Sequence, residues 1–178
     1  MRQFLYVLLV STIVVPSCTP IKELYINEDV QKPKPVKVAY SQALGMEAIN
    51  EIRYGTESYY DVEMEKALMK YGMTGQPVNV DFEPNDSLRI ANICRERHVD
   101  GLILTYFAKT YRENENHDYH MAISPASVIS LMYYNSDGRL ISVTQFKPAN
   151  DPYRDLKSHI SRGLRLSVLG LCNHVFKD

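Results

Sequence analysis

The chain has 178 residues, with 20 Lys or Arg against 21 Asp or Glu, so its formal net charge is −1 at pH 7. A charge so close to neutral argues against nucleic acid or anionic lipid as the main partner, because those partners select basic chains. The length suits a single domain with one hydrophobic core. We therefore expect one globular unit.

Residues 1–17 are typical of a bacterial lipoprotein export signal. The apolar run 4–15 is too short to span a hydrocarbon core, which needs about 20 residues, but long enough for the apolar part of a signal peptide. It ends in Val15-Pro16-Ser17-Cys18, which resembles the lipobox that lipoprotein signal peptidase recognises. We expect cleavage before Cys18 and lipidation of Cys18. The alternatives are an ordinary cleaved signal or a buried helix.

The acyl chains on Cys18 are the expected membrane attachment, because the sequence contains no second hydrophobic span. Two or more acyl chains make a stable anchor, whereas one chain binds marginally. Thr19 lacks the aspartate associated with inner-membrane retention. We therefore expect an outer-membrane lipoprotein that faces the periplasm, and a surface-exposed orientation stays open.

Residues 18–35 are predicted to form a lipidated tether, followed by a single domain over 36–178. The tether is polar and ends in Lys32-Pro33-Lys34-Pro35. Alternating prolines favour the extended polyproline II conformation and do not enter a sheet interior. This segment is expected to hold the domain away from the bilayer.

The first half of the domain alternates strands and helices. Hydrophobic periodicity and capping residues predict a strand over 36–40, a short helix over 46–52, a helix over 61–71, a strand over 77–82 and a helix over 87–98. The connection 41–60 is unusually long for a compact domain, so it requires either a function or a structure of its own.

The second half is richer in strands. Residues 100–111 predict a central strand, because both of its sides are largely apolar. Strands 128–134 and 139–146 flank Asn135-Ser136-Asp137-Gly138, which indicates an antiparallel hairpin. A long helix follows over 152–176. The expected fold is α+β, a mixed sheet of about five strands in the order β-α-β-α-β-β-β-α with helices packed on it.

Two cysteines remain in the domain. Cys94 and Cys172 each lie in a predicted helix among apolar neighbours. In an exported protein they could form a disulfide. The alternative is two inert, buried thiols, because free cysteine is among the most buried residue types.

The sequence offers little catalytic chemistry. His117 and His120 are weak candidates for a metal site, because two imidazoles near carboxylates could bind Zn²⁺, but their polar surroundings also fit a solvated loop. There is no phosphate-binding loop, no dinucleotide-binding glycine pattern and no framed serine nucleophile. We expect no cofactor, no metal and no enzymatic activity.

Tyrosine is the compositional outlier, with 13 Tyr and no Trp. Tyrosine combines a rigid apolar ring with a polar tip, which suits interfaces that stay soluble when empty. Tyr54, Tyr59 and Tyr60 lie in or beside the long connection and are the candidates for binding a partner. The alternative is that tyrosines pack on the strands. Weaker candidates are Tyr111, Tyr119 and Tyr153.

Three stretches, 61–72, 90–104 and 129–143, together resemble a group of envelope domains. The group is typified by the TolB amino-terminal domain, the curli-secretion lipoprotein and the lipoprotein activators of penicillin-binding proteins. The resemblance implies a non-enzymatic adaptor or assembly factor that binds another envelope protein. The alternative functions are an envelope hydrolase or metal-dependent enzyme, and a carrier of a small ligand.

Overall fold

The computed structural model describes residues 21–27, 34–45, 47–82, 85–108, 128–147 and 156–176. These residues form an α+β fold with a mixed six-stranded sheet, in the strand order β1-β8-β7-β6-β2-β5. Its strands are β1 (Ile21–Ile26), β2 (Lys37–Ser41), β5 (Thr74–Val78), β6 (Gly101–Ala108), β7 (Val128–Asn135) and β8 (Leu140–Phe146). The predicted fold class is confirmed.

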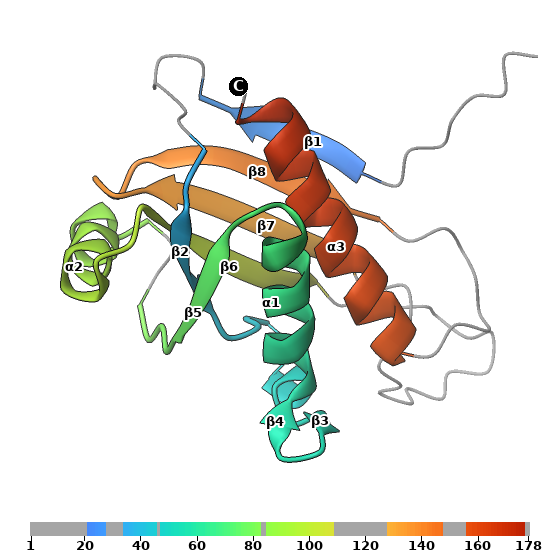
Figure 1. The fold of residues 1–178 in the computed structure, drawn as a ribbon. Helices are drawn as coiled ribbons and strands as arrows, with labels where there is room; N and C mark the ends of the chain where they lie inside the picture. The colour runs from blue at the N-terminus through green and yellow to red at the C-terminus, as the bar shows by residue number, and fades with distance from the viewer. Residues whose placement is uncertain are drawn as a thin grey trace, which may run out of the picture.

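The helices cover the two faces of the sheet unequally. Figure 1 shows α1 (Tyr59–Lys70) and α3 (Leu156–His174) over one face, and α2 (Ser87–Arg97) stands apart from them. The strands alternate between two apolar clusters, because successive residues point to opposite faces. Val38 and Tyr40 pack in the cluster with α1 and α3, whereas Ala39 packs in the cluster with α2.

Strand β2 lies between β5 and β6 and is parallel to both. All other neighbouring pairs of the large sheet are antiparallel, including the predicted hairpin of β7 and β8. Gly138 in the hairpin turn has a φ of 76°, which favours glycine as the turn pattern predicts. A Cβ atom there would also collide with the Ser87 carbonyl at the start of α2.

Side-chain caps set the helix starts. The Ser58 hydroxyl accepts a hydrogen bond from the Asp61 amide at 3.5 Å, so α1 begins earlier than the predicted residue 61. The Asp86 carboxylate accepts one from the Arg89 amide at 3.0 Å and caps α2.

The long connection 41–60 has a structure of its own. The Asn50 side chain binds both backbone groups of Ala43, at 2.9 and 3.0 Å, and closes this loop. Where a helix over 46–52 is predicted, the structure has a 3-10 turn, η1 (Glu47–Ile49). A short ribbon of β3 (Arg53–Tyr54) and β4 (Glu57–Ser58) follows and leads into α1.

Strand β1 corrects the predicted tether. Residues 21–26 pair antiparallel with β8, with Ile21 opposite Phe146 and Ile26 opposite Ser142. The prediction that 18–35 is entirely a spacer is therefore wrong for this part. The added strand also raises the sheet from about five strands to six.

Strand β5 lies earlier in the chain than the predicted 77–82. The Thr74 amide donates to the Val36 carbonyl at 2.8 Å. The backbone N–H groups of alternate β5 residues therefore point towards β2, and those of the residues between them point away from the sheet. Pro77 falls on the outward side, where its missing N–H leaves a gap in the exposed edge. Proline at such a position discourages another strand from pairing there.

The two cysteines do not meet. Cys94 lies in α2 and Cys172 in α3, so they belong to opposite faces of the sheet, and both are free. Burial raises the pKa of the Cys94 thiol to about 11, and burial also raises the pKa of Cys172. Both thiols are therefore protonated at neutral pH, as expected of the inert alternative.

Candidate protein interface

The three tyrosines predicted to bind a partner occupy different environments. Tyr60 is fully buried, and its hydroxyl donates to the Ser41 carbonyl at 3.0 Å and lies 2.7 Å from the Thr105 hydroxyl. Burial raises the pKa of this phenol, so it stays neutral. The prediction that Tyr60 contacts a partner is wrong, because the side chain belongs to the core.

Tyr54 is exposed, Tyr59 is partly buried beside it, and the two form a cluster with two lysines. The two rings are 6.4 Å apart, and Tyr54 is 61% exposed. The Lys66 ammonium lies 5.5 Å from the centre of the Tyr54 ring, and the Lys157 ammonium lies 5.4 Å from that of Tyr59. Both distances allow cation–π attraction. We call these four residues the Tyr–Lys cluster.

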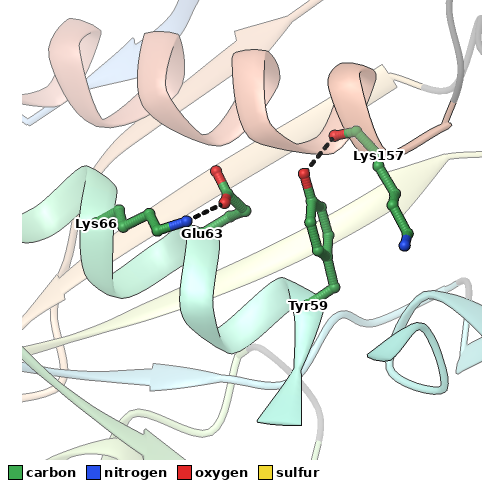
Figure 2. Close-up of polar contacts among 4 residues, drawn as sticks. All are labelled: Tyr59, Glu63, Lys66 and Lys157. Atoms are coloured by element: carbon green, nitrogen blue, oxygen red, sulfur yellow. Dashed lines mark hydrogen bonds and ion pairs between the residues drawn. The ribbon is translucent and has the colours of Figure 1, made fainter. Parts of the chain in front are cut away.

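Three elements, β3, α1 and α3, supply the Tyr–Lys cluster, and a hydrogen bond joins α1 to α3 within it. Figure 2 shows the Tyr59 hydroxyl pointing to the backbone of α3, where it donates to the Lys157 carbonyl at 3.3 Å. On α1, the Lys66 ammonium donates to the Glu63 carboxylate at 2.8 Å. Burial raises the pKa of Glu63, but hydrogen bonds from Lys66 and Ser161 outweigh it and lower the pKa below its ordinary value.

A second surface lies on the sheet face opposite α1 and α3. Cross-strand rows place Tyr25 beside Val143, Val143 beside Met132, and Ser130 between Gln145 and Tyr106. Tyr25 is 45% exposed and Tyr106 is 44% exposed, while the other four are partly exposed. We call this set the open sheet face: Tyr25, Tyr106, Ser130, Met132, Val143 and Gln145.

The position of α2 explains why this face is open. Ile90 and Cys94 of α2 pack with Ala39 and Leu102, at the part of the face formed by β2 and β6. Among the described helices, α2 alone contributes to this cluster, so the half formed by β1, β8 and β7 keeps partly exposed side chains. The polar contact there is weak, because Gln145 Nε2 is 3.4 Å from the Ser130 hydroxyl.

The open sheet face was not predicted from the sequence. The alternation of residues in β6 and β7 does assign Tyr106 and Met132 to one side of each strand. Alternation predicts which face of the sheet a side chain lies on. It does not predict whether a helix covers that face, because this depends on where each helix packs. Strand β1, which brings Tyr25, lay within the predicted tether.

Several predicted site residues lie outside the described residues. Among these are Cys18, His117 and His120, so the lipidation site and the weak metal candidates stay predictions. Within the described part of the chain, no three His, Cys, Asp or Glu side chains gather closely enough to hold a metal ion. None of the helices described there has the length and apolar character to cross a bilayer.

Comparison with solved structures identifies similar folds at low sequence identity. A PelC dodecamer from Paraburkholderia phytofirmans has a TM-score of 0.52 and 9% identity, over 89% of this chain and 98% of that chain. A PelC variant dodecamer from the same organism has a TM-score of 0.51 and 10% identity, over 84% and 96%. At these identities the similarity concerns the fold alone.

A PDZ domain protein from Parabacteroides distasonis matches over 90% of this chain and 36% of its own, with a TM-score of 0.47 and 16% identity. No family model matches the sequence. No curated protein matches it either.

Proposed function

We propose that this chain is a bacterial envelope lipoprotein, anchored through Cys18, whose domain acts without catalysis by binding protein through the open sheet face. The observation that carries the proposal is the part of this sheet face that no described helix covers, where Tyr25 of β1 and Tyr106 at the far end of β6 are each nearly half exposed. An outer-membrane location facing the periplasm follows from the sequence pattern around Cys18 and belongs to the same proposal.

The chemistry of the open sheet face suits a protein partner. Tyrosine and methionine are enriched at protein interfaces and charged residues are depleted from interface centres. The open sheet face contains two tyrosines, one methionine and one valine, and its remaining members are the uncharged Ser130 and Gln145. None of these six side chains is ionised, so burying them does not require a charge to leave water.

A second copy of the chain is the first partner to test. The PelC structures, which share this fold, are dodecamers. A fold of this kind can therefore assemble with itself, and an exposed sheet face supplies one surface for that assembly. The alternative result is that the open sheet face binds a different envelope protein, as expected of an adaptor.

The test compares the full lipidated chain with two variants by light scattering in detergent. We expect the wild type to form an oligomer and Tyr25→Ser with Tyr106→Ser to weaken it, by about 30-fold in Kd if the two rings contribute roughly 2 kcal/mol. Leu88→Ser is the control, because Leu88 is 70% exposed but lies on α2. This control should associate like the wild type.

A monomeric wild type would not by itself end the proposal, so crosslinking in intact envelopes completes the test. If the wild type is monomeric and the double variant captures the same proteins as Leu88→Ser, the open sheet face is not the binding surface. The anchor is tested separately by intact mass, which should show a diacylglyceryl group on Cys18 as the new amino terminus. The Cys18→Ala variant should remain unprocessed.

A further inference from the structure

Strand β1 leaves almost no chain between the predicted anchor and the sheet. It begins at Ile21, so only Thr19 and Pro20 separate it from Cys18. A fully extended chain spans roughly 3.3–3.6 Å per residue, so the start of the sheet lies within about 11 Å of the lipidated residue. A spacer as long as 18–35 would have allowed the domain to move freely above the bilayer.

The strand directions show which end of the molecule is held there. Ile21 lies opposite Phe146, the last residue of β8, and strands β7 and β6 continue the antiparallel order. Because β2 is parallel to β6, its last residue, Ser41, lies at this same end. Lys37, at the start of β2, lies at the opposite end together with the hairpin turn after Asn135.

The Tyr–Lys cluster lies at the anchored end. The Tyr60 hydroxyl binds the Ser41 carbonyl, which fixes the first turn of α1 at the end of β2. The His159 ring lies 5.6 Å from the Phe146 ring, which fixes the first turns of α3 at the end of β8. Tyr54, Tyr59 and Lys157 therefore lie beside strand ends that are in line with Ile21, with three strands between β1 and β2 in the sheet.

We propose that this end of the domain rests on the phospholipid headgroups of the bilayer that holds the anchor, with the Tyr–Lys cluster in contact with them. The inference depends on the anchor of the proposed function. Tyrosine rings and lysine side chains both suit this layer, because each combines an apolar body with a polar tip. In this proposal Tyr54 and Tyr59 contact lipid instead of the protein partner that the sequence predicted for them.

The short connection from Cys18 to β1, rather than electrostatic attraction, keeps the domain against the bilayer. Glu47, Glu51 and Glu57 are exposed in the same connection that carries Tyr54. These carboxylates offset the lysines, so the contact does not require anionic lipid. Consistent with this, the whole chain is nearly neutral.

The experiment uses the full lipidated protein in vesicles of phosphatidylcholine and a water-soluble amine-reactive reagent. Mass spectrometry measures the modification of Lys157 relative to Lys37, both of which are exposed in the structure. The matched control carries about ten Gly and Ser residues inserted between Pro20 and Ile21, which adds a flexible segment of roughly 17 Å root-mean-square length. We expect Lys157 to react several-fold more slowly, relative to Lys37, in the wild type than in the control.

Each other outcome overturns the proposal in a distinguishable way. An equal ratio of Lys157 to Lys37 modification in two lipidated proteins would show that the domain does not rest on the membrane, and it would leave the proposed function standing. Protection of Lys157 that persists after the insertion would indicate a second copy of the chain over the cluster. An unlipidated Cys18 in the intact mass would remove the anchor and with it the proposed function.

Discussion

At the scale of single residues, the tyrosines show how much depends on position. Tyr59 and Tyr60 are neighbours at the start of α1, yet Tyr59 is only partly buried whereas Tyr60 is fully buried in the core. A helix turns by about 100° per residue, so adjacent side chains point in different directions. The contribution of each hydroxyl to stability should therefore differ.

We expect Tyr60→Phe to lower the free energy of unfolding by about 1–3 kcal/mol, because it leaves the buried Ser41 carbonyl without this donor. Tyr59→Phe is the matched control and should cost about 0.5 kcal/mol, since its hydroxyl binds the Lys157 carbonyl near solvent. Urea denaturation of both variants measures the difference. Equal losses would show that the Tyr60 hydroxyl is not buried as described.

Residue type alone could not separate these tyrosines in the sequence. Tyr54, Tyr59 and Tyr60 carry the same ring, and the long connection offered no periodicity that assigns a face. The sequence predicts a helix that begins at residue 61, which puts Tyr60 in the connection before it. Because Ser58 caps α1, Tyr59 and Tyr60 both belong to this helix, and the Tyr60 hydroxyl reaches Thr105.

The pairing of Glu63 with Lys66 gives a pH-dependent prediction. Because the folded pKa of Glu63 is lowered, the ionised form stabilises the fold above its unfolded pKa of about 4.3, and this stability is lost as pH falls through the folded pKa. Glu63→Gln should cost about 0.5 kcal/mol at pH 7, a modest value because Lys66 is well exposed. Thermal melts should give a difference that shrinks below pH 4; a difference that persists there would assign the loss to packing.

At the scale of elements, the elements with strong local signals were predicted and those fixed by pairing were not. The β7–β8 hairpin and helices α1, α2 and α3 have turn or periodicity signals, and the structure contains all four. Strand β5 was misplaced because Thr74-Gly75-Gln76 has weak strand propensity, and its pairing with β2 decides its position. Strand β1 was missed because the prolines after it suggested a spacer.

Two glycines, one in the β7–β8 hairpin turn and one in the β3–β4 ribbon, allow the cost of backbone strain to be measured separately from the cost of a steric collision. Gly55 has a φ of 66° with open space around it, whereas Gly138 has a φ of 76° and would collide with Ser87 if it had a Cβ. We expect Gly55→Ala to cost about 1 kcal/mol from φ alone. Gly138→Ala should cost that amount plus roughly 1–3 kcal/mol for overpacking.

Chemical denaturation of the two variants measures these costs. A similar loss for Gly55→Ala and Gly138→Ala would mean that the turn does not press against the start of α2. A loss confined to Gly138→Ala would instead show that the ribbon relaxes around residue 55.

At the scale of the whole molecule, the sheet brings distant parts of the chain together. Strand β1 pairs with β8, and α3 packs on both of them. The residues that follow the predicted anchor therefore depend on the carboxyl-terminal part of the domain for their structure. The sequence could not show this dependence, because antiparallel pairing between remote strands leaves no local pattern.

Hydrogen exchange of the full chain tests whether β1 belongs to the domain. The Asn27 amide donates to the Ile141 carbonyl at 2.8 Å, and the register with β8 extends from Ile21 to Ile26. Because β1 is an edge strand, only its alternate amides point towards β8. We expect the Asn27 amide and the β1 amides that point towards β8 to exchange at least about 100-fold more slowly than in an unstructured chain, equivalent to roughly 2.7 kcal/mol for local opening. The amide of exposed Thr56 in the β3–β4 turn is the internal comparison. If β1 exchanges as fast as Thr56, it acts as a tether, and the close approach of the domain to the bilayer no longer follows.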